Sequence, residues 1–462
     1  MGSWLTLSMA RGTAVIPAAA QPRLLYVLLE VRPGGDGPGQ RLPLNLGLVV
    51  DVSRSMQVPI VTEEQFEWLA RQGHAREVMV DGLPVWHIEQ APIEFAAGLP
   101  TSQTFVREAL ATVSSQLRAG DRSALIAFAS EGQVVATGLA GPLPAAVLDA
   151  LGGLDLGEET WMARGLSLGL EEVQRRGAGP DSVNRVLILT DGFTLDEDEC
   201  RALAYRARQA GIAISTLGLG IEFNEELLIP LAEASGGHAY LIQQPEEIPG
   251  VFVEELQRAE AVIYRNVEIK LQLTPGVELR RAVRVSPAIG DLGEVPSEGG
   301  SANLFLGDLE WDAPPAVLLE LIAPPRPAGS YRLCQVALAY DDPAGPAAKV
   351  RQDVVVEYGS DPAVLAARPD PRVMNIVERV TAFRLQTQAL AQAAAGDLAG
   401  ATVKLRAAAT RLLDMGEPAL AQSALQEADN LERRGQLSPA DRKRMRYTTR
   451  RLTQPLGPGA SG

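Results

Sequence analysis

The sequence predicts an α/β domain with a doubly wound, mostly parallel sheet, inserted in a β-sandwich and followed by a C-terminal helical bundle. Three observations predict this order. Apolar runs alternate with helix-like stretches over residues 41–258, period-two alternation flanks that region on both sides, and apolar residues follow helical spacing after residue 370. The chain has 462 residues, and at about 150 residues per domain this length suits roughly three domains.

The composition is that of a folded protein, with 46% hydrophobic and 21% charged residues. There are 42 Lys and Arg against 57 Asp and Glu, giving a net charge of -15. Nucleic acid is therefore not expected as a partner, because an acidic chain repels phosphates. Two cysteines cannot form a disulfide framework, which favours a reducing compartment.

Residues 1–40 are predicted to form strands that belong to the sandwich. Leu25, Val27, Leu29 and Val31 share one strand face, because side chains alternate with period two. The first 23 residues have no basic start before their apolar part, so we interpret them as strand rather than signal peptide. No apolar stretch reaches the ~20 residues of a spanning helix, and we expect no transmembrane segment and a cytoplasmic location.

The region 41–258 begins with the apolar run LNLGLVVD, typical of a strand buried on both faces. Similar runs and helix-like stretches alternate after it, which favours a parallel sheet covered by helices. The predicted strands are 44–51, 123–130, 185–191 and 212–220. The predicted helices are 102–118, 143–151, 163–176, 196–210 and 223–235.

Residues 57–100 interrupt this alternation and are interpreted as an insertion. Val78 and Val80 precede an Asp-Gly turn signal, and Val85 and Trp86 follow it, which predicts a hairpin.

The remaining chain divides into a sandwich, a helical domain and a tail. Period-two runs separated by Pro- and Gly-rich turns predict a β-sandwich over 259–358. The strands of 1–40 are too few to bury a face alone, so we expect them to complete this sandwich. Helical spacing with breaks near 396, 416 and 438 predicts about four helices over 370–452. The last residues, 453–462, are expected to be a disordered tail.

The strongest chemical signal is Asp51-Val52-Ser53-Arg54-Ser55, directly after the first buried strand. Loops at the carboxyl ends of parallel strands are where open α/β sheets bind ligands. A carboxylate and two hydroxyls on alternate residues can converge on one point, and these hard oxygen donors suit Mg²⁺, Mn²⁺ or Ca²⁺.

Two further residues fall in matching places. Asp191 ends another buried strand, and Thr160 lies in a loop just before a predicted helix. All five residues would then share one edge of the sheet. The alternative is structural, with the Ser and Thr residues capping helices and Asp191 starting a turn.

This ordered set resembles the von Willebrand factor A domain and its metal-ion-dependent adhesion site. That pattern is Asp-x-Ser-x-Ser, then a Thr in a loop, then Thr-Asp-Gly after a central strand. The resemblance covers about residues 42–258. It implies that Ser53 and Ser55 bind the metal directly. It also implies that Asp51, Thr160 and Asp191 bind the metal directly or through water, and that an Asp or Glu of a protein partner fills the open position.

Two features depart from the family pattern. Arg54 stands where the family commonly has Gly, and the insertion follows the motif at once. In one hypothesis Glu63, Glu64 or Asp81 fills the open position and inhibits the protein. In the other, which we favour, the insertion is a structural flap.

The function expected from the resemblance is a non-catalytic, metal-dependent protein interaction module. The domain order resembles bacterial von Willebrand A proteins described as chloride-channel-like, but without a visible pore segment we do not expect channel activity. An alternative is a regulatory subunit of a MoxR-type ATPase or of a chelatase-like complex. A serine hydrolase is disfavoured, because the string around Ser167 lies in a predicted helix rather than in a strand–turn–helix.

The C-terminal stretch 431–452 carries eight Lys and Arg against two acidic residues. We interpret it as a helical face that docks on the acidic body of the same chain. The alternative is a binding patch for an acidic protein, a membrane surface or RNA.

Overall fold

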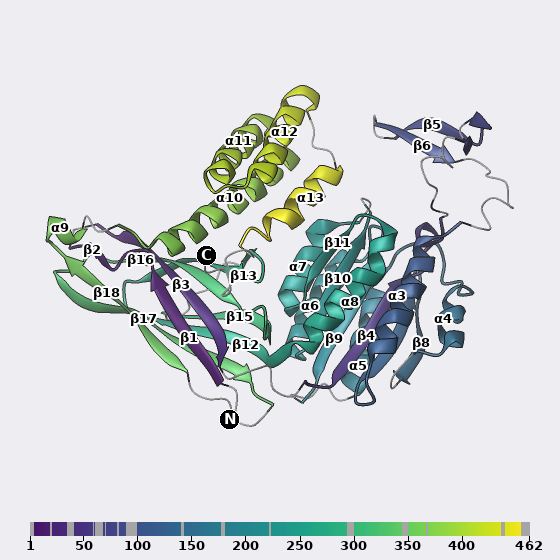
Figure 1. Cartoon of the computed structure of the whole chain (residues 1–462), viewed down its shortest axis with the longest axis horizontal. Coiled ribbons are helices and arrows are strands. Elements are labelled where there is room, and N and C mark those ends of the chain that lie inside the picture. Colours follow the sequence, from purple (N-terminus) through teal and green to yellow (C-terminus); the bar gives the residue numbers. More distant parts are fainter. Residues whose placement is uncertain are drawn as a thin grey trace.

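The computed structural model describes residues 4–18, 21–34, 41–58, 60, 68–69, 71–80, 83–88, 99–139, 143–176, 181–220, 223–292, 300–343, 350–365, 368–435 and 439–453. Figure 1 shows a β-sandwich beside an α/β domain, with a set of C-terminal helices above them in this view. The predicted fold class is therefore confirmed.

The α/β domain is built on a sheet in the order β11-β10-β9-β4-β7-β8. Neighbouring strands are parallel except β8, which is antiparallel to β7 at the edge. The first strand of the domain, β4, lies inside the sheet, and all eight of its residues are buried. The strands are β4 (Leu44–Asp51), β7 (Arg122–Phe128), β8 (Gly132–Leu139), β9 (Val183–Thr190), β10 (Ala213–Leu219) and β11 (Ala239–Ile242).

Helices cover both faces of this sheet, because strands that are apolar on both sides need cover on both. One face packs against α3, α4 and α8, and the other against α5, α6 and α7. The helices are α3 (Ser102–Gln116), α4 (Ala145–Leu151), α5 (Met162–Arg175), α6 (Glu197–Gln209), α7 (Glu225–Ser235) and α8 (Ile248–Glu260). Two short 3-10 turns are η1 (Arg54–Gln57) and η2 (Pro245–Glu247).

The sandwich has two five-stranded sheets, β1-β3-β16-β13-β14 and β15-β12-β17-β18-β2. Strands from before the α/β domain join both sheets: β3 pairs with β16, and β2 pairs with β18. The α/β domain is thus an insertion between parts of one sandwich. The strands are β1 (Trp4–Arg11), β2 (Val15–Pro17), β3 (Arg23–Gly34), β12 (Val262–Leu273), β13 (Glu278–Ser286), β14 (Gly290–Asp291), β15 (Ser301–Glu310), β16 (Ala316–Ala323), β17 (Gly329–Asp341) and β18 (Arg351–Gly359).

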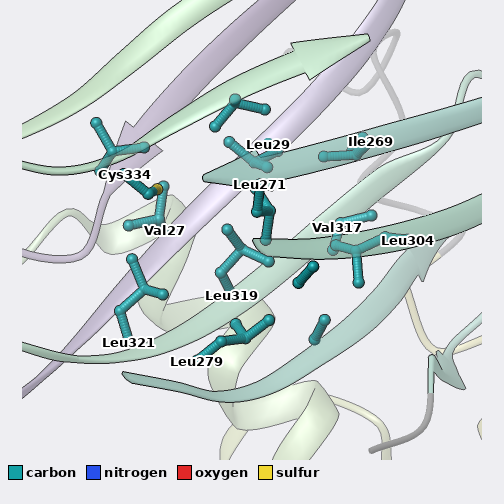
Figure 2. Packing of buried hydrophobic residues seen from close by; sticks show 14 of the residues in the cluster. Val27, Leu29, Ile269, Leu271, Leu279, Leu304, Val317, Leu319, Leu321 and Cys334 are labelled. Carbon is teal, nitrogen blue, oxygen red and sulfur yellow. The ribbon is translucent and has the colours of Figure 1, made fainter. Parts of the chain in front are cut away.

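Figure 2 shows the core between the two sheets, where side chains meet from strands that precede and strands that follow the α/β domain in the chain. Val27 and Leu29 of β3 pack with Leu271 of β12 and Leu319 of β16. At about 1.5–3 kcal/mol for each large apolar side chain buried, these contacts are the main force that holds the N-terminal strands in place.

The C-terminal helices are α9 (Pro362–Leu365), α10 (Pro371–Ala394), α11 (Leu398–Asp414), α12 (Pro418–Arg434) and α13 (Pro439–Thr449). Helix α10 packs on the outer face of the β3–β16–β13 sheet, where Val373 and Ile376 meet Leu28 and Leu318. Asp370 begins this helix, because its carboxylate accepts hydrogen bonds from the backbone N–H groups of the first turn.

Helix α13 carries four of the eight basic residues of the stretch 431–452. It docks on α7 of the α/β domain, as the sequence predicted. Lys443 and Glu225 form an ion pair at 2.6 Å, and both side chains are buried. Arg446 pairs with Glu226 at 2.7 Å. Tyr447 joins the apolar cluster of α5, α6 and α7. The helix therefore ties the C-terminal helices to the α/β domain.

Several expectations are refined by the structure. The hairpin of the insertion is present as β5 (Ala75–Val80) paired with β6 (Leu83–Ile88). The apolar pattern of the sequence did not predict β8, β11 and α8 of the α/β domain. Of the predicted tail, Thr453 is described and is buried, whereas 454–462 lie outside the described residues. Among the helices that the structure describes, none is long and apolar enough to cross a membrane.

Candidate metal centre

The site begins where β4 ends. Asp51 is the last residue of this strand and is almost fully buried. Its carboxylate accepts a hydrogen bond from the backbone N–H of Ser53 at 2.8 Å and one from the Thr190 hydroxyl at 2.7 Å. Burial raises the pKa of Asp51 above its ordinary value, although these hydrogen bonds act in the opposite direction. A buried carboxylate whose hydrogen-bond donors are neutral is short of positive charge.

A chain of hydroxyls connects Asp51 to the neighbouring strand. The backbone turns at Ser53, and its hydroxyl lies 3.1 Å from that of Ser55. The Ser55 hydroxyl in turn donates to the Asp191 carboxylate at 2.6 Å. Strands β4 and β9 are adjacent and parallel, so the residues after each strand meet at the same edge of the sheet. The motif and Asp191 are thereby brought together.

Thr160 reaches the site on a loop held against β7. Gly157 has φ +90°, and a Cβ at this position would lie 2.5 Å from the Ser130 hydroxyl, so only glycine fits. The Ser130 hydroxyl also accepts the backbone N–H of Glu159 at 3.0 Å. A Cβ on Gly192 would lie 3.5 Å from the Thr160 hydroxyl, which places Thr160 beside the residue that follows Asp191. All five predicted residues therefore gather at this edge.

The loop after Asp191 clamps the Thr160 loop from the other side. The Thr194 hydroxyl accepts the Met162 N–H at 2.9 Å and donates to the Asp196 carboxylate at 2.5 Å, and it also lies 3.2 Å from the Thr160 carbonyl oxygen. The Asp196 carboxylate accepts the Ala163 N–H at 2.9 Å. Thr194 and Asp196 thus supply the caps of α5. The sequence indicated Asp196 as the start of the next helix and did not predict this capping role.

The hydroxyls of the site are not used as helix caps. Ser53 precedes η1 but makes no side-chain cap hydrogen bond, and Trp161 rather than Thr160 precedes α5. Over the part of the chain that the structure describes, no three His, Cys, Asp or Glu residues form a metal-binding group. A metal here would rely on hydroxyls and two carboxylates. Hard oxygen donors of this kind fit Mg²⁺, Mn²⁺ or Ca²⁺.

The two departures from the family pattern lie at the border of the site. Arg54 is exposed and faces Glu158 at 3.5 Å across the loops, so it points away from the buried carboxylate. The Ile60 N–H donates to the Pro100 carbonyl at 2.8 Å, so the inserted segment leaves and returns at one point beside η1. Glu63, Glu64 and Asp81, the hypothetical internal ligands, lie outside the described residues.

The string around Ser167 is helical, as predicted. Ser167 lies inside α5, and its hydroxyl faces Glu171 at 3.4 Å. The flanking glycines allow close packing, because a Cβ on Gly165 would lie 2.6 Å from the Phe128 ring and one on Gly169 would lie 2.6 Å from Val49. These positions serve the contact between helix and sheet.

Two family models match parts of the chain. Residues 101–254 match the von Willebrand factor type A domain, and residues 371–455 match the Sll0103-like C-terminal alpha-helical domain. The first match begins after the insertion, although β4 and the Asp51 motif before it belong to the same sheet.

Similar proteins extend the likeness to nearly the whole chain. An uncharacterized protein of Synechocystis, sll0103, is 27% identical over 461 residues, covering 98% of each chain. A von Willebrand factor type A structure from Catenulispora acidiphila has a TM-score of 0.70 at 18% identity, covering 97% of this chain and 96% of that one. The ArnB paralog VWA2 from Sulfolobus acidocaldarius has a TM-score of 0.57 at 14% identity, covering 97% and 99%. These structures show that the arrangement of all three parts recurs.

Proposed function

We propose that this chain, which contains a von Willebrand factor type A domain and a Sll0103-like C-terminal helical domain, is a non-catalytic module that binds a protein partner through a divalent metal ion. Domains of this type are protein interaction modules. The finer statements, which concern the metal, its ligands and the partner's carboxylate, are our inference from the residues at the edge of the sheet.

Asp51, Ser53, Ser55, Thr160 and Asp191 would hold the ion, which we take to be Mg²⁺, with Mn²⁺ or Ca²⁺ as alternatives. The observation that carries the proposal is the buried Asp51 carboxylate, which receives only hydroxyl and N–H groups from the described residues. A buried charge is costly unless it is paired or coordinates a metal. A divalent cation would remove that cost.

The donor set also accounts for the partner's chemistry. Three of the five side chains are neutral hydroxyls, so two carboxylates would at most balance the charge of the ion. Mg²⁺ demands six oxygen ligands and is seldom enclosed by protein alone. An Asp or Glu of a partner would supply a charged ligand at the open side, and this gives the contact its dependence on metal.

Isothermal titration of the full chain with MgCl₂ and MnCl₂ tests the proposal, using wild type, Asp51→Asn and the control Asp198→Asn. Asp198 is fully exposed. We expect saturable binding to wild type and to the control, and none to Asp51→Asn. Without metal, Asp51→Asn is expected to melt at the wild-type temperature or above it, because it removes a buried charge. Equal binding by Asp51→Asn and wild type would refute the metal centre.

A further inference from the structure

The loop that carries Asp191 exposes two large apolar side chains. Phe193 is 59% exposed and Leu195 is 61% exposed, whereas Thr194 between them is 8% exposed. On the other side of the motif, Val58 is 57% exposed, and its N–H donates to the Ser55 carbonyl at 3.1 Å. We call these three residues, Val58, Phe193 and Leu195, the apolar rim.

The exposure of Phe193 and Leu195 accompanies the hydrogen bonds of their loop. The Leu195 N–H donates to the Thr160 carbonyl at 3.1 Å, and the buried Thr194 hydroxyl accepts the Met162 N–H and donates to the Asp196 carboxylate. Thr194 is thereby held inward, while its two neighbours in the chain are exposed. The loop whose bonds place Thr160 therefore also presents Phe193 and Leu195 to solvent.

The exposed carboxylates around the site are paired with arginines. Glu158 pairs with Arg54 at 3.5 Å, Glu131 with Arg164 at 2.6 Å and Asp198 with Arg201 at 3.1 Å. These three pairs carry no net charge, so they offer no cationic patch for a partner surface rich in acidic residues. A single carboxylate set among apolar side chains would bring the ligand that the metal needs and would match the exposed apolar rim.

We propose that the partner presents one Asp or Glu flanked within about two residues by large apolar side chains, which cover Phe193 and Leu195 while the carboxylate meets the metal. This proposal rests on the metal-dependent function proposed above. The apolar contact supplies affinity and the metal supplies the dependence on an acidic residue. Specificity is then set by the residues beside the carboxylate.

The first experiment is hydroxyl-radical footprinting of the full chain in Mg²⁺. Phe193 and Leu195 are expected to oxidise at the rates of exposed side chains, similar to the exposed Val403 and Leu413 of α11. Protection of Phe193 and Leu195 in the free protein would mean that the chain's own segment covers the rim. That result would overturn the proposal.

The second experiment selects a random dodecapeptide library on the full chain in Mg²⁺ and elutes it with EDTA. We expect the eluted peptides to share one acidic residue with Leu, Ile, Phe, Met or Trp beside it. The variant Phe193→Ser/Leu195→Ser should bind them about 100-fold more weakly, whereas the matched variant Val403→Ser/Leu413→Ser should bind as wild type.

The outcomes separate the two proposals. EDTA-eluted peptides with clustered acidic residues, or with no apolar residue beside the acidic one, would overturn the proposal for the apolar rim but not the proposal for the metal centre. Equal affinity of Phe193→Ser/Leu195→Ser and wild type for the eluted peptides would have the same consequence. A library that yields no peptide eluted by EDTA would overturn metal-mediated binding, and the rim proposal with it.

Discussion

Replacing Lys443 by Met should weaken the docking of α13 on the α/β domain. The Lys443 ammonium donates to the Glu225 carboxylate at 2.6 Å and to the Phe223 carbonyl, and it lies 4.0 Å from the centre of the Phe223 ring. Both side chains of the pair are 1% exposed. Met keeps an unbranched side chain against Phe223 but removes the charge, so the substitution tests the ion pair rather than the packing.

The expected magnitude follows from the burial of the pair. Removing one partner of a buried ion pair typically costs about 3–5 kcal/mol, because the other charge remains buried. Arg442 also contacts Glu225, at 3.0 Å, and still compensates part of that charge. We therefore expect the lower end, about 3 kcal/mol. At about 1.4 kcal/mol per tenfold, this equals roughly a hundredfold rise in the opening of α13.

Hydrogen–deuterium exchange of the α13 amides measures this opening directly. The matched control is Arg446→Met, one turn along the same helix, whose partner Glu226 is exposed. Exposed pairs contribute about 0–1 kcal/mol, so the control should change exchange less than about fivefold. The double variant Lys443→Met/Glu225→Gln should recover much of the lost protection. Equal exchange in Lys443→Met and the control would refute the reasoning.

Three further predictions concern buried groups away from the candidate metal centre. Cys200 and Cys334 are buried, and burial raises the pKa of the Cys334 thiol to about 12. Neither thiol should therefore react with a thiol reagent at pH 8 until the protein unfolds. Rapid labelling of either cysteine in the folded protein would contradict this. Gly237→Ala should lower the free energy of unfolding by about 1–3 kcal/mol, because its Cβ would lie 2.1 Å from the Ile214 carbonyl oxygen. The control is Gly250→Ala in α8, where a Cβ meets nothing within 4 Å; this variant should be neutral or stabilising. Urea unfolding measures both. Burial alone would raise the pKa of Glu255, but the Arg185 guanidinium at 2.7 Å holds this pKa well below its usual range. The depressed pKa contributes stability above the unfolded value of about 4.3, and this stability is lost as the pH falls through the folded value. Glu255→Gln should therefore flatten the acid side of a plot of melting temperature against pH, and an unchanged slope would count against the ion pair.

The fold was largely predictable because its elements carry simple periodicity. The apolar run of Leu44–Asp51 and the helix breaks near Gly396 and Gly416 correspond to observed element ends. Strand β8 was missed since it lies at the sheet edge, where half-exposed residues leave no continuous apolar run. Strand β11 has only four residues, which is too short for a pattern.

The sequence predicted that these residues lie at one edge of the sheet, but it did not predict the contacts that hold them there. Asp51, Ser53 and Ser55 follow one strand and Asp191 another, so strand order alone places them together. The contacts of Thr190 with Asp51 and of Thr194 with the Thr160 carbonyl join loops far apart in the chain. No local spacing encodes such contacts, and only the tertiary arrangement reveals them. Metal occupancy itself remains a prediction.

The pairing of β3 with β16 has a consequence for how the chain is made. About 290 residues separate Leu29 from Val317, its partner in the register. At about 5–20 residues per second, a ribosome needs roughly 15–60 s to produce the second strand after the first. During that interval β3 can pair with β1, which precedes it, but its other edge lacks β16 and its apolar face is uncovered while the α/β domain folds. A nascent-chain chaperone that shields β3 would therefore raise the yield of native protein during synthesis.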